Sequence, residues 1–329
     1  SFSRDGNVLL AGEAEFYWNR LVGPDQLKDG EARFRYIRVP GIWNGRVEQG
    51  RVISGDGCAT YRLSVILPPA YGAVGGERLA SMVPDLGSAY RLYLDGRLAG
   101  SGGMVGESAS AARPGYRPGV YECVPSGSRL EVILQISNFH HRKGGAWEKI
   151  FIGPAPMVRD VRERRLVLDF FLFGSIVIIG LYHLVLFIMR KQERSYFYFG
   201  IFCLLIAARI LATGDYYMIR LFPGVSWEIV IGTEYLSFYA AVPLFFLFMG
   251  SLFPAECAAR VLRSMTGIFA LFCSAVILLP PRLYTWTMQC CQACLIALCL
   301  WGFATLVLAI ARKRDGALPF LGGFIILFA

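Results

Sequence analysis

The stretch RDVRERRLVLDFFLFGSIVIIGLYHLVLFIM, residues 159–189, decides the fold, because a charged segment ends within it and a long apolar run begins. Residues 1–165 carry 39 charged side chains, and residues 166–329 carry only 18. A helix needs about 20 apolar residues to cross a bilayer. The sequence therefore predicts a water-exposed domain (1–158), a basic juxtamembrane joint (159–165) and a multi-span transmembrane bundle (166–329).

Five apolar runs in the second half are long enough, or nearly so, to span a membrane. They are Leu166–Met189, Tyr196–Thr213, Ile229–Phe253, Leu262–Leu279 and Met288–Ala311. A sixth run begins at Ala317 and is cut off at Ala329. The expected bundle is all-α, with five full spans and the start of a sixth.

The loops between these runs differ in basic charge. One set carries eight basic residues: Arg190, Lys191, Arg194, Arg260, Arg263, Arg312, Lys313 and Arg314. The opposite set carries only Arg220 and Arg282. Since short cytoplasmic loops are enriched in Lys and Arg, the basic loops are expected in the cytoplasm and the N-terminal domain outside it. The arginines at 159–165 disagree, but they adjoin a long translocated domain, where the rule is weak, and lipid headgroups are an alternative partner.

Ionisable residues inside spans are costly and usually face the bundle interior. Asp169, Arg209 and Glu234 fall at similar depth near the outer ends of the first three spans. We expect Arg209 to pair with Glu234, Asp169 or both, either to hold the fold or as a polar relay beneath the outer domain. His183 lies deeper in the first span and is expected to make an interhelical hydrogen bond.

The first half has the pattern of a β-sandwich, in which turn residues separate short runs rich in Val, Ile, Leu and Tyr. The predicted strands are Phe34–Val39, Thr60–Leu67, Tyr90–Leu94, Arg97–Gly100 and Glu131–Ser137. Asp95-Gly96 predicts a type I′ hairpin turn, which needs positive φ at both central residues. The fold class is therefore an all-β jelly-roll sandwich followed by an all-α membrane bundle.

Aromatic and polar residues gather at the expected strand ends, including Phe16-Tyr17-Trp18-Asn19. An aromatic ring can stack on a sugar while polar neighbours bind its hydroxyls; the alternative is that these rings close the core. The candidate ligand-binding residues are Trp43, Asn44, Tyr90, Tyr116, Asn138, His140, His141, Arg142 and Trp147. His140 and His141 are not expected to share a metal ion, because strand neighbours point to opposite faces.

Composition argues against several functions. The chain has three His and none of the common hydrolase, phosphate-loop or zinc-protease motifs, so the visible chain is not expected to be an enzyme. No cofactor, metal or nucleic-acid partner is expected, and Cys290, Cys291 and Cys294 are interpreted as helix-packing residues. Cys58 and Cys123 either form a disulfide in an exported domain or remain free thiols.

Several segments resemble known proteins. Ser88–Gly96 (SAYRLYLDG) and Val132–Asn138 (VILQISN) resemble the galactose-binding-like jelly roll of family 2 glycosidases. The longer pattern resembles bacterial 7TMR-DISM receptors, which are seven-span receptors with diverse intracellular signalling modules. Its features are Phe16–Asn19, Val39–Gly45, Ser137–Arg142, Leu181–His183, Tyr198–Gly200 and Glu234–Tyr239.

The resemblance implies a receptor in a bacterial inner membrane, with a periplasmic jelly roll that binds a small molecule or glycan. It also implies a homodimer and a cytoplasmic output domain, such as a cyclase, kinase or phosphatase, that is not in this chain. One alternative is a non-signalling membrane protein, either a transporter or an assembly subunit whose β domain docks a partner protein. The other is a glycosidase on a membrane anchor.

The predicted topology can be tested with protease added to the outside of sealed spheroplasts. We expect cleavage within residues 1–158 and protection of the loop that contains Arg312–Arg314. Protection of the first 158 residues until the membrane is permeabilised would reverse the topology.

Overall fold

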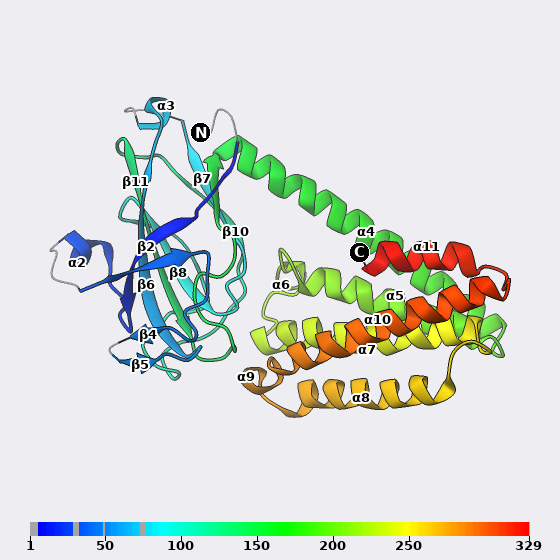
Figure 1. Ribbon diagram of the computed structural model, residues 1–329. Helices are drawn as coiled ribbons and strands as arrows, with labels where there is room; N and C mark the ends of the chain where they lie inside the picture. The colour runs from blue at the N-terminus through cyan, green and yellow to red at the C-terminus, as the bar shows by residue number, and fades with distance from the viewer. Residues whose placement is uncertain (1–5, 29–32, 49, 73–76, 329) are drawn as a thin grey trace. The chain divides into compact units, whose positions relative to one another are not determined.

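The computed structural model describes residues 6–28, 33–48, 50–72 and 77–328 (Figure 1). The chain folds as two compact units. Unit 1 comprises Ser1–Leu168 together with Gly214–Trp227, and unit 2 comprises Asp169–Thr213 and Glu228–Ala329. Unit 1 thus contains the β domain and a returning segment from the helical half.

Two antiparallel sheets make up most of the β domain. The six-stranded sheet has the order β3-β2-β6-β11-β8-β9, and the four-stranded sheet has the order β1-β12-β7-β10. Strands of the first are β2 (Gly12–Trp18), β3 (Arg35–Val39), β6 (Gly57–Ile66), β8 (Ala89–Leu94), β9 (Arg97–Gly102) and β11 (Arg129–Asn138). Strands of the second are β1 (Val8–Leu9), β7 (Leu79–Val83), β10 (Gly119–Cys123) and β12 (Phe151–Pro154). A separate pair joins β4 (Val47–Glu48) to β5 (Arg51–Val52), and two short helices are α2 (Pro24–Lys28) and α3 (Pro69–Gly72).

Strand β11 is central to the larger sheet. Its residue Leu134 lies opposite Tyr61 of β6 on one side and Leu92 of β8 on the other. All three side chains belong to the main core, which also contains Trp43 and Ile152. The opposite face of β11 is covered as well, because Ile133 packs with Tyr17, Val22 and Leu27. The strand is therefore buried on both faces, which explains the imperfect alternation of VILQIS.

The Asp95-Gly96 hairpin is confirmed. It joins β8 to β9, and Asp95 and Gly96 have φ angles of 47° and 74°. The carboxylate of Asp95 also accepts a hydrogen bond from the main-chain N–H of Glu131, at 2.9 Å. This side-chain bond supports the left-handed backbone at a residue that is not glycine.

Other expectations for the β domain need correction. The run Phe16–Trp18 forms the C-terminal end of β2, as expected, but the aromatic rings of Phe16 and Tyr17 are buried and therefore belong to the core. Strands β7, β10 and β12 are absent from the predicted set, because each has only four or five residues and includes Gly, Ala, Ser or Pro. Their strand conformation comes from pairing within the four-stranded sheet, which overrides weak local preference.

The helical half agrees closely with the predicted spans. Its helices are α4 (Ala155–Met189), α5 (Arg194–Ala212), α6 (Tyr217–Leu221), α7 (Trp227–Leu252), α8 (Ala259–Leu278), α9 (Pro281–Tyr284), α10 (Thr287–Ala311) and α11 (Ala317–Phe328). Among the described residues, five helices (α4, α5, α7, α8 and α10) are long and apolar enough to cross a membrane. The predicted fold class, a β domain followed by a membrane-helix bundle, is confirmed.

Helix α7 is the centre of the bundle. Half of the residues in the most apolar stretch of α7 are buried in the protein, compared with 6% of those in the corresponding stretch of α4. Phe246 of α7 contacts Trp301 of α10, and Phe245 contacts Phe324 of α11. Helices α4 and α5 approach closely at Gly180, where an added Cβ would lie 3.1 Å from the carbonyl oxygen of Gly200. Small residues permit such approach between membrane helices.

Two of the basic loops meet in unit 2. Glu256, in the α7–α8 loop, accepts a hydrogen bond from Arg314 Nε at 2.8 Å and forms an ion pair with Arg312 at 3.5 Å. The α7–α8 and α10–α11 loops therefore lie at the same end of the bundle, as alternate loops of a membrane bundle should.

Trp43 provides a test of the β-domain core. Its side chain is 0% exposed, and its indole N–H donates to the carbonyl of Gly55 at 3.1 Å. We expect Trp43→Ala to lower the free energy of unfolding by about 3–5 kcal/mol, because it leaves a cavity and removes a buried hydrogen bond. The neighbouring Ile42 is 41% exposed, so Ile42→Ala should cost much less. Pulse proteolysis of the β domain within the full chain measures both, and equal losses would contradict the assigned burial.

Candidate functional site

Asn138, at the end of β11, holds the loop that follows it. Its side-chain amide donates to the carbonyls of Gly55 at 2.8 Å, His141 at 2.7 Å and Lys143 at 3.0 Å. Its side-chain carbonyl accepts the main-chain N–H of His141 at 3.0 Å. Asn138 is 1% exposed, so these bonds replace water and fix the loop to the strand.

Asn44 secures the same loop from the other side. Its amide donates to the carbonyl of Arg142 at 2.9 Å, and its carbonyl accepts the N–H of Gly144 at 2.9 Å. The main-chain N–H of Trp43 also donates to the carbonyl of Gly144, at 2.9 Å. The chain segments around Trp43 and residues 138–147 therefore form one hydrogen-bonded loop cluster, in which the polar groups of both asparagines are used internally.

His141 and Trp147 complete this loop cluster. Their rings stack with centroids 6.4 Å apart, and Trp147 Nε1 donates to the carbonyl of Leu86 at 3.2 Å. The ammonium of Lys143 lies 5.1 Å from the Trp147 ring centroid. Burial lowers the pKa of His141 to about 4, and the nearby Arg142 and Lys143 contribute to that lowering. His141 is thus neutral at physiological pH, and its Nδ1 can accept the N–H of Lys143 at 3.2 Å.

These contacts place six of the nine predicted ligand residues together, namely Trp43, Asn44, Asn138, His141, Arg142 and Trp147. They are brought together as a structural cluster: Trp43 and Asn138 are buried, and their polar atoms bond to the chain itself. Neither can stack on or bind a sugar without unfolding the loop. For these two residues, core packing and not ligand contact is the observed role.

The other three predicted residues lie elsewhere in unit 1. Tyr90 is buried, and its hydroxyl donates to the carbonyl of Arg117 at 2.5 Å and lies 2.8 Å from the hydroxyl of Tyr121. The Tyr116 ring stacks on that of Tyr216 with centroids 4.2 Å apart. The rings of His140 and Trp227 meet edge-on, with centroids 6.3 Å apart. Tyr116 and His140 therefore meet the returning segment Gly214–Trp227, which no sequence pattern associates with the β domain.

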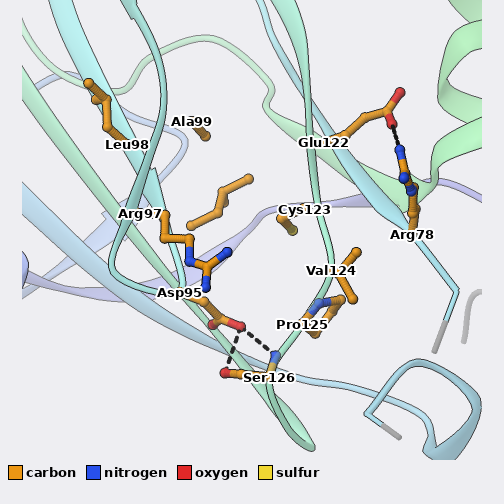
Figure 2. Close-up of a pocket in the computed structure, with 11 residues that line it drawn as sticks. Arg78, Asp95, Arg97, Leu98, Ala99, Glu122, Cys123, Val124, Pro125 and Ser126 are labelled. Carbon is orange, nitrogen blue, oxygen red and sulfur yellow. Dashed lines mark hydrogen bonds and ion pairs between the residues drawn. The ribbon is translucent and has the colours of Figure 1, made fainter. Parts of the chain in front are cut away.

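An open cleft of about 620 Å³ lies between β9 and β10, the edge strands of the two sheets (Figure 2). We name it the β9–β10 cleft. It is lined by Arg78, Leu94, Asp95, Arg97, Leu98, Ala99, Glu122, Cys123, Val124, Pro125 and Ser126. Figure 2 shows charged side chains at both ends of the cleft and apolar ones between them. Such a mixture suits a small polar ligand.

The charged groups of the β9–β10 cleft are held by specific contacts. The Asp95 carboxylate accepts hydrogen bonds from Ser126 N at 2.9 Å and Ser126 Oγ at 3.1 Å. Glu122 forms an ion pair with Arg78 at 3.6 Å, and its other oxygen pairs with Arg159 of α4. Apart from the hairpin residue Asp95, no sequence motif indicates this site, because only the fold of the two sheets brings β9 and β10 side by side.

Cys58 and Cys123 are free thiols in the structure, as in the second of the two alternatives. Cys58 lies in β6 with its thiol 3.8 Å from Asn19 Oδ1, and Cys123 lies in β10, at the edge of the other sheet. Burial raises the pKa of each to about 11, which disfavours the reactive thiolate. In the part of the chain that the structure describes, no three His, Cys, Asp or Glu residues group as metal ligands.

The polar residues of the spans are partly as expected. Arg209 Nη1 donates to the main-chain carbonyl of Glu234 at 2.7 Å, and its guanidinium lies 5.0 Å from the Phe238 ring centroid. Arg209 and Glu234 are therefore neighbours, but this hydrogen bond is to the main chain of Glu234 and not to its carboxylate. The polar relay that includes Asp169 stays a prediction. His183 differs from expectation, because its Nδ1 bonds to Ile179 of its own helix at 2.8 Å and its contacts with α5 are ring contacts with Tyr196 and Phe199.

Comparison with known proteins identifies the membrane half. The sequence model of the family described as "7TM diverse intracellular signalling" matches residues 165–329. This agrees with the resemblance noted from the sequence. No curated protein matches the chain.

Solved structures similar to the chain include glycoside hydrolase family 2 enzymes. A β-galacturonidase from Eisenbergiella tayi bound to galacturonate matches 45% of this chain and 24% of its own, at 12% identity and a TM-score of 0.31. A β-glucuronidase from Ruminococcus gnavus matches 44% of this chain and 28% of its own, at 13% identity and a TM-score of 0.32. The match thus spans about a quarter of each enzyme, and at these TM-scores it carries no conclusion about ligand or activity.

His141 predicts a pH dependence of stability. The unfolded chain binds a proton near pH 6.5 and the folded chain only near pH 4. The stability from the neutral, buried ring is therefore complete above pH 6.5 and is lost as pH falls toward 4, by up to about 3 kcal/mol. We expect His141→Gln to flatten the stability profile of the β domain between pH 6.5 and 4, measured by pulse proteolysis. The neighbouring substitution His140→Gln is the control, and an unchanged profile in His141→Gln would contradict the assignment.

Proposed function

The chain belongs to the 7TM diverse intracellular signalling family, and from this premise we propose that it is a receptor whose β domain senses a ligand outside the cytoplasm. The ligand is a carbohydrate or an envelope glycan. Its binding is relayed through the membrane helices to a cytoplasmic output domain beyond this chain. The distribution of Lys and Arg among the short loops supports this orientation.

The observation that carries the proposal is the direct connection between the β domain and the first membrane helix. Strand β12 ends at Pro154, and α4 begins at Ala155 and continues as one helix to Met189. Ala155 and Val158 are buried against Ala80 of β7, and Ala155 N donates to the carbonyl of Arg78 at 2.9 Å. No flexible linker separates sheet from helix, so a change in the four-stranded sheet is transmitted to the start of α4.

The β9–β10 cleft is the ligand site in this proposal. Glu122 is the key side chain, because it pairs with Arg78 of the cleft and with Arg159 of α4. A ligand hydroxyl that binds Arg78 or Glu122, or a ligand carboxylate that binds Arg78, competes with these ion pairs. It therefore alters how α4 is held against the sheet, which gives the ligand unequal affinity for two arrangements, as any signal requires.

The chemistry of the cleft favours a hydroxylated ligand. Arginine and carboxylate side chains bind sugar hydroxyls through charge-assisted hydrogen bonds, and Arg97, Asp95 and Ser126 line one end. Leu98, Val124 and Pro125 supply apolar surface for the carbon skeleton. No aromatic side chain lines this cleft among the described residues, so the binding in this proposal depends on polar contacts and not on ring stacking.

Binding can be tested with the full chain in lipid nanodiscs, titrated calorimetrically with a panel of neutral and acidic oligosaccharides. We expect at least one to bind, and Arg97→Gln to weaken it by about tenfold, since a hydrogen bond from a charged group is lost. Arg129→Gln is the matched control, because Arg129 is an exposed arginine at the start of β11, outside the cleft. The absence of any binder, or equal losses in both variants, would refute the carbohydrate proposal.

The relay needs a separate measurement with the ligand so found. A flexible Gly-Ser insertion between Pro154 and Ala155 should leave binding intact but abolish ligand-dependent changes in hydrogen exchange of α5 and α7. If those changes persist in the insertion variant, α4 is not the connection. A protein that binds its ligand without any change in the bundle is better explained as a non-signalling membrane protein.

A further inference from the structure

A second cleft in unit 1 brings three arginines together. Its volume is about 590 Å³, and we name it the α6 cleft. Arg117 comes from the loop before β10, Arg162 from α4 and Arg220 from α6. The remaining lining residues are Tyr116, Pro118, Gly119, Val120, Tyr121, Asp215, Tyr216, Ile219, Pro223 and Gly224.

The charges of the α6 cleft do not balance. Its only acidic lining residue among those described is Asp215, against three arginines. Asp215 lies 4.0 Å from Arg162 Nε, a long ion pair, and also accepts the hydroxyl of Tyr217 at 3.1 Å. Arg117 and Arg220 have no ion-pair partner within the described parts of the chain. The cleft therefore has a surplus of two positive charges, and a cleft lined by one sign of charge concentrates the opposite ion.

One nitrogen of the Arg162 guanidinium also lacks a hydrogen-bond acceptor. Arg162 Nη2 is buried and has no hydrogen-bond partner among the described residues. A buried donor without an acceptor costs free energy, and more when it is charged. Native proteins seldom keep such a group unless a ligand, ion or water satisfies it. Arg162, which lines the cleft, thus keeps a donor that the chain itself does not satisfy.

We propose that the α6 cleft binds a phosphate group, held by Arg117, Arg162 and Arg220. Planar guanidiniums match phosphate oxygens with paired hydrogen bonds, and three of them can surround one phosphate. A carboxylate has only two oxygens, whereas a phosphate has at least three and can offer a separate oxygen to each guanidinium. The phosphate belongs either to a small solute or to the headgroup of an anionic lipid, since both present the same oxygens. This site is separate from the β9–β10 cleft and extends the proposed function.

Occupation of this site has a structural consequence. The three arginines come from three chain segments, so one phosphate joins the loop before β10, helix α4 and the returning segment Gly214–Trp227. That segment already contacts the β domain through the Tyr216 hydroxyl, which donates to Asp85 at 3.1 Å, and the Tyr216 ring, which stacks on Tyr116. The phosphate strengthens the attachment of a loop between α5 and α7 to the sensor domain.

The test uses the full chain in nanodiscs of phosphatidylcholine, titrated calorimetrically with inorganic phosphate, and a second preparation that contains phosphatidic acid. We expect the double variant R117Q/R220Q to weaken phosphate binding by about tenfold or more, which corresponds to about 1.4 kcal/mol. Arg162 is left intact because it pairs with Asp215. The control is R51Q/R129Q, which removes the same charge from exposed positions on β5 and β11.

The two preparations separate the two sources of phosphate. Binding of inorganic phosphate that R117Q/R220Q loses and R51Q/R129Q retains supports a solute site. If only phosphatidic acid raises the melting temperature of the protein, and R117Q/R220Q alone loses the increase, the site is one for lipid headgroups. The proposal is overturned if neither form of phosphate has an effect, or if both double variants respond alike, since that result indicates general attraction to a basic surface.

Discussion

The fold depends on one constraint, which is that a single helix must begin against a β-sheet and continue as a membrane span. At its start, α4 is held by the packing of Ala155 and Val158 on Ala80 and by the Ala155–Arg78 hydrogen bond. Its later residues are almost wholly apolar, because lipid offers no partners for polar groups. The basic segment between them carries the ion pairs of Arg159 with Glu122 and of Arg162 with Asp215.

The returning segment Gly214–Trp227 gives the β domain a second link to the membrane helices. Tyr216 bonds to Asp85 and stacks on Tyr116, and Trp227 contacts both Tyr116 and His140. The β domain is thus joined to α4 by the chain itself and to α5 and α7 through this loop. Three membrane helices are thus connected directly to the β domain, in a chain whose family is described as 7TM diverse intracellular signalling.

The predicted ligand residues divide according to what a sequence can reveal. Trp43, Asn138 and His141 are correctly grouped as a cluster of aromatic and polar side chains. Whether the polar groups of such a cluster face solvent or bond to the chain depends on which backbone carbonyls lie nearby. Here the carbonyl of Gly55, distant in sequence from Asn138, accepts hydrogen bonds from both Trp43 and Asn138. Apart from Leu94 and Asp95, which lie in the SAYRLYLDG segment, the residues of the two clefts belong to no motif noted in the sequence, because each cleft is formed by segments far apart in the chain.

By itself, the sequence determined the division into β domain and membrane bundle, four of the five spans to within a few residues, the end but not the start of the first helix, and the Asp95-Gly96 hairpin. These depend on local properties: the length of an apolar run, the periodicity of a strand and the φ angles open to Asp and Gly. Only the tertiary structure decided the four-stranded sheet, the free thiols of Cys58 and Cys123, the attachment of Gly214–Trp227 and both clefts. Each of those depends on contacts between residues distant in the chain, whose free energy exceeds the weak preference of short segments.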